Sequence, residues 1–304
     1  MLRVTPGLRT MKRNGRITFM KFTISTRWHH PLEIVETFKK FGRLDSLQSV
    51  YGFLFDSPLN GGRQRKDCIN FPLETIDQLN DLGVGYSFTL SNLCIAREHL
   101  EDQHTNEVLK RFENPLNGVI VAHDSVAEYV REMYPAYHLR ASCIYNYLTA
   151  DEVNRACERF DEVCVFPEVN HREETLDNIA HKEKVVLFAT SVCLNQCGIN
   201  RLSHYYLLGQ DHIGWYNHQK YKIPYREDAF HSPHMPWCKA RSSTPTVHDL
   251  DYFSGKGFTT FKVTQFDLFV NSHFKKEESE KDSWKSSGLK RPGKLFRFKR
   301  KSIR

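Results

Sequence analysis

The strongest constraint on the fold is a regular alternation of apolar, strand-like runs with helical stretches. Eight runs have the length and composition of buried strands, at 17–25, 49–55, 84–90, 118–122, 139–145, 162–166, 184–190 and 258–264. Helical patterns are expected over 31–41, 73–82, 98–112, 125–133, 149–160, 172–181 and 266–274. Such alternation implies parallel strands joined by right-handed crossovers. Because no GxGxxG or Walker motif follows any strand, the sequence favours a closed α/β barrel of the (β/α)8 TIM type over an open nucleotide-binding sheet.

Charge divides the 304 residues into three parts. Residues 1–32 hold seven Lys and Arg and no acid, and 275–304 hold twelve Lys and Arg against four acids. The total of +7 leaves 33–274 at −8. We expect a flexible basic leader over 1–16, one barrel domain over 17–274 and a disordered basic tail over 275–304. Without an apolar stretch of transmembrane length or a signal peptide, a cytoplasmic protein with no transmembrane segment is expected.

A cysteine- and histidine-rich insertion, 191–256, follows the seventh strand. It holds six of the fifteen histidines and the cysteines Cys193, Cys197 and Cys238. Chemistry in barrels gathers at the carboxyl ends of the strands, so these three thiols are expected at one site, with His204 as a further ligand. Thiolates suit both iron–sulfur clusters and zinc, and buried cysteines without a metal are common. The expectation is a [4Fe-4S] cluster, with zinc or no metal as the alternatives.

Other polar residues follow the strands and are expected at the same mouth. Glu168 and His123 are candidates for proton transfer, although the pair His123-Asp124 could instead cap the following helix, with Asp124 as the cap. The remaining candidates are Asn60, Gly61, Gly62, Arg63, Ser87, Asn92, Asn146, Asn170, Lys262 and Gln265. Of these, Arg63 follows a glycine pair that allows close approach of a ligand, and its planar guanidinium matches a carboxylate or phosphate. We expect Gly61, Gly62, Arg63, Asn170 and Lys262 to bind substrate, with Arg63 also acting in catalysis.

Three motifs together resemble the collagenase-like peptidase family (peptidase family U thirty-two) over roughly residues 17–265. They are Val-Tyr-Gly-Phe-Leu-Phe at 50–55 with Asn60-Gly-Gly-Arg63, Cys193-x3-Cys197-x6-His204-Tyr205, and Phe261-Lys262-Val263. The resemblance implies a barrel with a cysteine set after a strand, and family members include oxygen-independent hydroxylases that use a [4Fe-4S] cluster. This chain has three well-placed cysteines where the family has four, and reads Val-Thr-Gln265 after Lys262 where the family continues Glu-Gly-Arg.

Three functions remain open from the sequence. The first is an iron–sulfur enzyme that modifies, and by resemblance hydroxylates, a polar or nucleic-acid substrate. The second is a zinc-dependent, peptidase-like hydrolase that uses a metal-bound water. The third is a non-catalytic barrel that recruits a partner through its basic arms. Residues 288–304 hold eight Lys and Arg interleaved with Leu295, Phe296 and Phe298, which suits RNA or single-stranded nucleic acid, a membrane surface or no partner.

Overall fold

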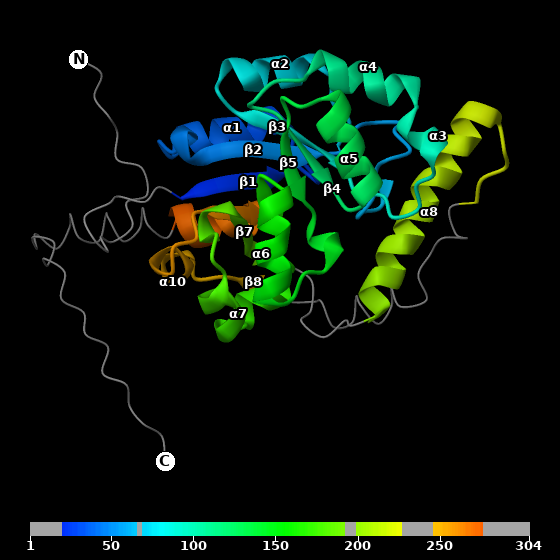
Figure 1. The fold of residues 1–304 in the computed structure, drawn as a ribbon. Helices are drawn as coiled ribbons and strands as arrows, with labels where there is room; N and C mark the ends of the chain where they lie inside the picture. Colours follow the sequence, from blue (N-terminus) through cyan, green and yellow to red (C-terminus); the bar gives the residue numbers. More distant parts are fainter. Residues whose placement is uncertain (1–19, 66–68, 192–198, 227–245, 276–304) are drawn as a thin grey trace, which may run out of the picture.

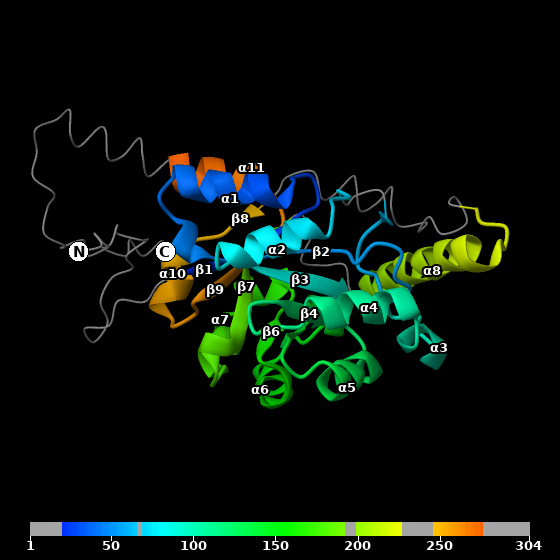
Figure 2. The same cartoon turned by 90° about the horizontal axis from the view of Figure 1, so that it is seen from above.

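The chain folds into a closed ring of parallel strands surrounded by helices, in a computed structural model that describes residues 20–65, 69–191, 199–226 and 246–275 (Figures 1 and 2). The eight strands of the ring are β1 (Lys21–Ser25), β2 (Leu47–Gly52), β3 (Gly85–Leu90), β4 (Gly118–Val121), β5 (His138–Ala141), β6 (Glu162–Cys164), β7 (Val185–Ser191) and β9 (Thr260–Val263). Strands β1 to β7 pair in chain order, and β9 pairs with both β7 and β1, which closes the ring. The expected (β/α)8 barrel is confirmed.

Helices cover the outside of the ring. They are α1 (Pro31–Lys40), α2 (Glu74–Asp81), α3 (Arg97–Leu100), α4 (Gln103–Arg111), α5 (Asp124–Met133), α6 (Ala150–Arg159), α7 (Glu173–Asn178), α10 (Leu250–Gly255) and α11 (Phe266–Phe269). Five of those described, α1, α4, α5, α6 and α10, begin at a side-chain cap. At α6, Thr149 and Glu152 form a capping box. The prediction of a single helix over 98–112 is wrong. Asp102 caps α4 as a separate helix, because its carboxylate accepts a hydrogen bond from the Thr105 amide at 3.0 Å.

The connection between β7 and β9 contains a 23-residue helix, α8 (Ile199–Tyr221), and a short strand, β8 (Thr246–Val247), antiparallel to the end of β7. Helix α8 lies at the carboxyl ends of the strands (Figure 1). Its contacts there are with loops: Asn92 donates to the Gly209 carbonyl at 3.1 Å, and His212 Nε2 lies 2.9 Å from the Arg63 carbonyl. This helix therefore forms part of the wall around the barrel mouth.

Apolar side chains fill the space between the ring and the helices. One aromatic cluster joins the first and last strand–helix units of the barrel: the rings of Phe22 and Phe269 lie 4.9 Å apart, and those of Phe38 and Phe274 lie 5.0 Å apart. Phe274 is fully buried, in a π-helical turn that follows α11. The packed body therefore includes this residue, which holds the end of the chain's last described segment against α1.

The inside of the barrel is polar where branched apolar residues usually dominate. Arg140 and Glu162 form a buried ion pair with a Nε–Oε2 distance of 2.7 Å. Arg140 also donates to Thr23, whose hydroxyl lies 2.9 Å from that of Ser49. A barrel interior built in this way depends on complete pairing of its polar groups, because an unpaired buried charge is costly.

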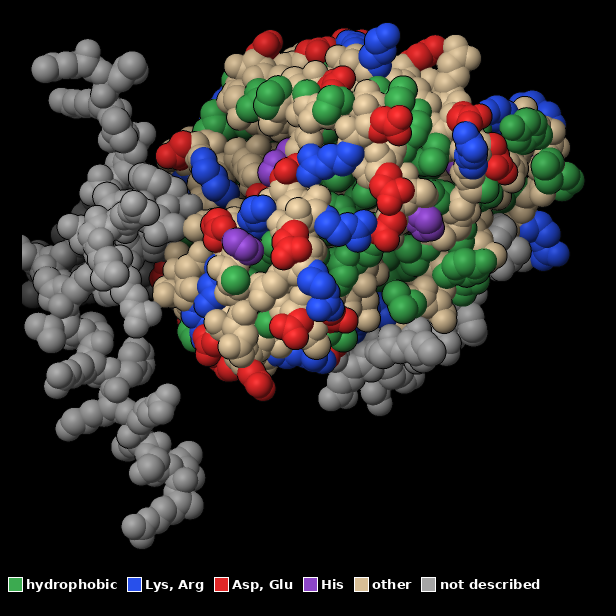
Figure 3. Space-filling view, viewed as in Figure 1, with side chains coloured by type: hydrophobic (Ala, Val, Ile, Leu, Met, Phe, Trp, Pro, Cys, Tyr) green, Lys and Arg blue, Asp and Glu red, His purple; other side chains and the backbone are tan. Residues whose placement is uncertain are grey.

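The surface carries charged side chains of both signs. Figure 3 shows Lys and Arg interspersed with Asp and Glu over the face of Figure 1, without a large area of one sign. Among the described residues, no helix has the length and apolar character needed to cross a membrane.

Candidate functional site at the barrel mouth

A buried lysine lies at the centre of the barrel mouth. Lys262 is only 6% exposed, and its Nζ lies 4.6 Å from the ring centre of Tyr51 and 5.6 Å from that of Phe188. Strand alternation puts it inside the ring, because its neighbours Phe261 and Val263 face the outer apolar core. In the described part of the chain no carboxylate pairs with Lys262. A buried ammonium stabilised mainly by aromatic faces is well suited to receive an anion.

Arg63 reaches the same place from the loop after β2. Its guanidinium donates to the hydroxyl of Ser25 and lies 4.9 Å from the ring centre of Tyr51. The glycine pair positions it: Gly62 has φ +79°, and a Cβ on Gly61 would lie 2.6 Å from the Ser91 carbonyl oxygen. The group that approaches Gly61 closely is therefore the backbone of the loop that contains Ser91.

Two thiols also lie at the barrel mouth. Cys143 follows β5 and Cys164 ends β6, and both are buried beside Phe188. The hydrogen bond from Cys164, with the charges of Lys262 and Arg63, lowers the pKa of Cys143 in spite of its burial. Burial raises the pKa of Cys164. Burial would lower the pKa of Lys262, but the facing thiol pair outweighs that effect and raises it. The arrangement favours one thiolate beside two cations.

Glu168 lies in an ion-pair network that fixes α8. Arg201 of α8 donates to Glu168 at 3.1 Å and to Asn146 at 2.6 Å, and its guanidinium lies 3.3 Å from the Phe166 ring centre. Arg172 forms a second ion pair with Glu168. Burial would raise the pKa of Glu168, but the hydrogen bonds from both arginines lower it. A carboxylate held in this way anchors α8 and is a weak proton acceptor near neutral pH.

Three other expected residues have local contacts in the described structure. His123 is itself the cap of α5, with Nδ1 accepting from the Ser125 amide at 3.3 Å, and Asp124 is the first helical residue. Ser87 lies in mid-strand and bonds Ser49 inside the barrel, so its expected place at the mouth is wrong. His204 is half-buried on α8, where its ring contacts Tyr205.

Asn170 contributes an unsatisfied acceptor near β7. Its amide nitrogen donates to the Phe188 carbonyl at 2.9 Å, while its buried Oδ1 has no hydrogen-bond partner among the described residues. Such an atom is costly to bury, so it is a candidate for receiving a hydrogen bond from a ligand.

The expected metal ligands Cys193, Cys197 and Cys238 lie outside the described residues. Strand β7 ends two positions before Cys193, and α8 begins two positions after Cys197. Within the ranges that the structure describes, no group of three or more His, Cys, Asp or Glu side chains could hold a metal ion. The three expected cysteine ligands are therefore not tested by the described residues.

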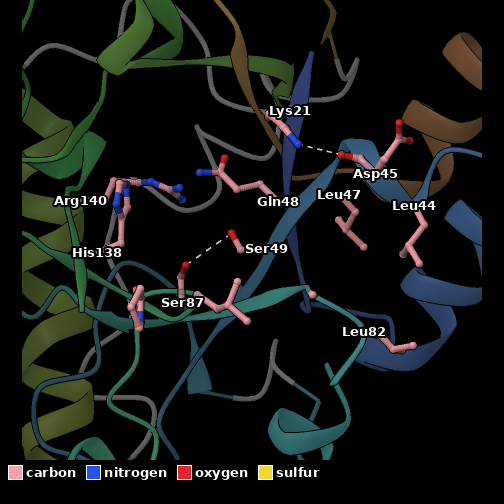
Figure 4. Close-up of a pocket in the computed structure, with 14 residues that line it drawn as sticks. Lys21, Leu44, Asp45, Leu47, Gln48, Ser49, Leu82, Ser87, His138 and Arg140 are labelled. Carbon is pink, nitrogen blue, oxygen red and sulfur yellow. Dashed lines mark hydrogen bonds between the residues drawn. The ribbon is translucent and has the colours of Figure 1, made fainter. Parts of the chain in front are cut away.

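The opposite end of the barrel holds a cavity of about 480 Å³ lined by both polar and apolar residues (Figure 4). Lys21, Gln48, His138 and Arg140 point toward it, and Lys21 donates to the Asp45 carbonyl at 2.8 Å. Arg140, on its wall, is paired with Glu162. In TIM barrels the amino-terminal end contributes to stability rather than to catalysis, so the mouth remains the candidate site.

Comparisons with known proteins show a shared fold. A solved structure of the U32 peptidase Mk0906 superposes with a TM-score of 0.53 at 12% identity, over 84% of this chain and 96% of that one. A scan against family models and a search of curated proteins found no match. At this identity the likeness establishes the barrel fold and leaves the chemistry to be argued from the site.

Four residues of the mouth were not among the expected site residues: Tyr51, Cys143, Cys164 and Arg201. Buried cysteines without a special role are common, and nothing in the local sequence distinguishes these two thiols from Cys157. Their position at the carboxyl ends of neighbouring strands was the available signal, because such positions converge in a barrel.

Proposed function

We propose that this protein is a barrel enzyme, distantly related to the U32 peptidases, that binds an anionic group of its substrate between Arg63 and Lys262. The observation that carries the proposal is the burial of Lys262 between two aromatic rings with no described carboxylate beside it. The ammonium of Lys262, which has no described carboxylate beside it, can attract a carboxylate or phosphate. Arg63 would bind the group through two parallel hydrogen bonds, and Lys262 would act as a point charge.

Inorganic phosphate is a suitable probe of this site. Isothermal titration calorimetry should show binding to the wild-type protein and a loss of affinity of roughly tenfold or more in Lys262→Met and in Arg63→Gln, given the strength of charge-assisted hydrogen bonds. Lys21→Met serves as the control, because Lys21 lies at the amino-terminal end of the barrel, opposite the mouth. Its affinity for phosphate should equal that of the wild type. If both mouth variants bind phosphate as tightly as the wild type, the proposed site is wrong.

An iron–sulfur cofactor is the second part of the proposal, with zinc as the alternative. Cys193, Cys197 and Cys238 would hold a [4Fe-4S] cluster through thiolates, with His204 as a candidate fourth ligand. The position of Cys193 directly after β7 supports a cluster near the mouth. Such a group supplies electron transfer when bound, and this chemistry would allow a hydroxylation; zinc would support a hydrolysis.

Anaerobic purification with iron, sulfide and zinc analysis separates these alternatives. We expect iron and sulfide in similar amounts and a visible absorption band in the wild-type protein. In Cys193→Ser the iron, the sulfide and the band should all be lost. Cys157→Ser, which removes a buried thiol of α6, should retain them. Zinc without sulfide would favour the hydrolase, and protein without metal would favour a scaffold that acts through its arms.

A nucleic-acid substrate is proposed on the basis of the basic tail alone. Residues 276–304 lie outside the described structure, and their Lys and Arg content suits phosphate contacts whose strength falls with salt. Deletion of 276–304 should weaken binding of a single-stranded RNA oligonucleotide and reduce its salt dependence. Unchanged RNA affinity would contradict this role.

A further inference from the structure

We propose that Cys143 and Cys164 are a redox-active dithiol at the barrel mouth, in which Cys143 reacts with a small hydroperoxide and Cys164 then closes a disulfide. This inference concerns a second chemistry of the mouth, and it is independent of the three cysteines of the insertion.

The geometry of the barrel brings the two thiols together. Strands β5 and β6 are parallel neighbours with Ala141 opposite Val163, and the two cysteines follow these positions closely. By this register Cys164 lies opposite Ser142, and Cys143 is the next residue along the chain, at the start of a 3-10 turn. Both thiols lie in one small buried cluster with Phe166, Val186 and Phe188, and both are free cysteines. Their proximity allows a disulfide to form between them.

The surroundings make one of the two thiols reactive. Cys143 is the more exposed member, at 9%, and Cys164 is fully buried. The hydrogen bond from Cys164 and the charges of Lys262 and Arg63 lower the pKa of Cys143, whereas burial raises that of Cys164. A thiolate beside cations is the form that reacts with peroxides, and a neighbouring thiol resolves the product. Because Cys143 is only 9% exposed, only a small oxidant can reach its sulfur.

The reaction balances with hydrogen peroxide as the oxidant. The Cys143 thiolate attacks one peroxide oxygen, the O–O bond breaks, and hydroxide leaves, which produces a sulfenic acid on Cys143. The sulfur of Cys164 then attacks that of Cys143, the S–O bond breaks, and the departing hydroxide takes the proton of Cys164 as water. Two thiols are oxidised to one disulfide, and the peroxide, with the proton released when Cys143 ionised, is reduced to two waters.

Oxidation would also change the charge of the mouth, a consequence that rests on the proposed anion site. The disulfide removes the negative charge of the Cys143 thiolate, so the potential at Lys262 becomes more favourable to an anion. Phosphate should bind several-fold more tightly to the oxidised protein than to the reduced protein. Disulfide formation is measured separately, so a failure of the anion site leaves the dithiol testable.

The experiment compares Cys143 with Cys94 in the same full-length, reduced wild-type protein. Cys94 is half-buried and hence more exposed than Cys143, but burial raises its pKa to about 11. After brief treatment with limiting hydrogen peroxide, alkylation and non-reducing peptide mass mapping, a Cys143–Cys164 cross-linked peptide should accumulate at least about tenfold faster than oxidation of Cys94, because thiolate content controls the rate. Oxidation of Cys94 first, or absence of the cross-link, would overturn the proposal.

Two variants assign the order of the steps. In Cys164→Ser the reaction should stop at a Cys143 sulfenic acid, which dimedone captures, and Lys262→Met should slow labelling of Cys143 about tenfold without changing Cys94. Cys157→Ser is the matched control, because it removes a buried thiol that has no contact with the pair, and it should form the cross-link at the wild-type rate. Dimedone labelling of Cys164 rather than Cys143 in the wild type would refute the assigned nucleophile.

Discussion

Removal of Arg140 from the barrel interior should lower the free energy of unfolding and reverse part of the dependence of that free energy on pH. Arg140 and Glu162 side chains are 3% and 7% exposed, and they are joined by two hydrogen bonds. Burial alone would raise the pKa of Glu162, but the charge of Arg140, with a smaller contribution from His138, lowers it from an ordinary value of 4.5 to about 2. Each tenfold change in an equilibrium constant is worth about 1.4 kcal/mol, so the ionised form of Glu162 stabilises the fold by about 3 kcal/mol relative to its protonated form.

The sign of the pH dependence follows from that lowered pKa. In the wild type the contribution of Glu162 is complete above pH 4.5 and is lost as the pH falls toward 2. In Arg140→Met the buried carboxylate loses its main partner, and burial raises its pKa above the unfolded value. The variant should therefore lose about 3–5 kcal/mol at pH 7 and regain part of it between pH 7 and 5, as Glu162 takes up a proton.

Urea denaturation followed by far-ultraviolet circular dichroism at pH 7 and pH 5 measures both effects. The double variant Arg140→Met/Glu162→Leu is the control, because replacing both charges with apolar groups is often neutral or stabilising. It should be more stable at pH 7 than Arg140→Met and should lack the gain at pH 5. Equal unfolding free energies for Arg140→Met and the wild type at both pH values would refute the reasoning.

The remaining predictions concern packing and caps, and urea denaturation tests each of them. Gly61→Ala should cost about 1–3 kcal/mol because its Cβ would meet a carbonyl oxygen at 2.6 Å, whereas Gly255→Ala, which meets nothing within 4 Å, should not lose stability. Thr149→Ala should cost about 1 kcal/mol through loss of the α6 cap; an unchanged midpoint would contradict it. Phe274→Ala should cost about 3–5 kcal/mol, while deletion of 276–304 should leave the midpoint in place.

The architecture of this protein was predictable from sequence because its signals are local. A buried strand shows an apolar run, and a helix shows its period and its cap, as at Thr149 and Glu152. Parallel crossovers then leave few arrangements for eight strand–helix units. Even so, the sequence pattern could not show that Asp102 divides one expected helix into two, because an acid within a polar helical stretch is compatible with both a surface position and a cap.

The amino-acid sequence by itself determined the eight strands, their order and the end of the barrel at which chemistry is expected, whereas only the tertiary structure decided which side chains meet there. Lys262 was expected at the mouth, but its aromatic surroundings come from Tyr51 and Phe188, which are far away in the sequence. The thiol pair and the interior ion pair likewise depend on the register between β5 and β6. Register and barrel closure are set by the packing of the whole ring, and therefore leave no local signal at any one residue.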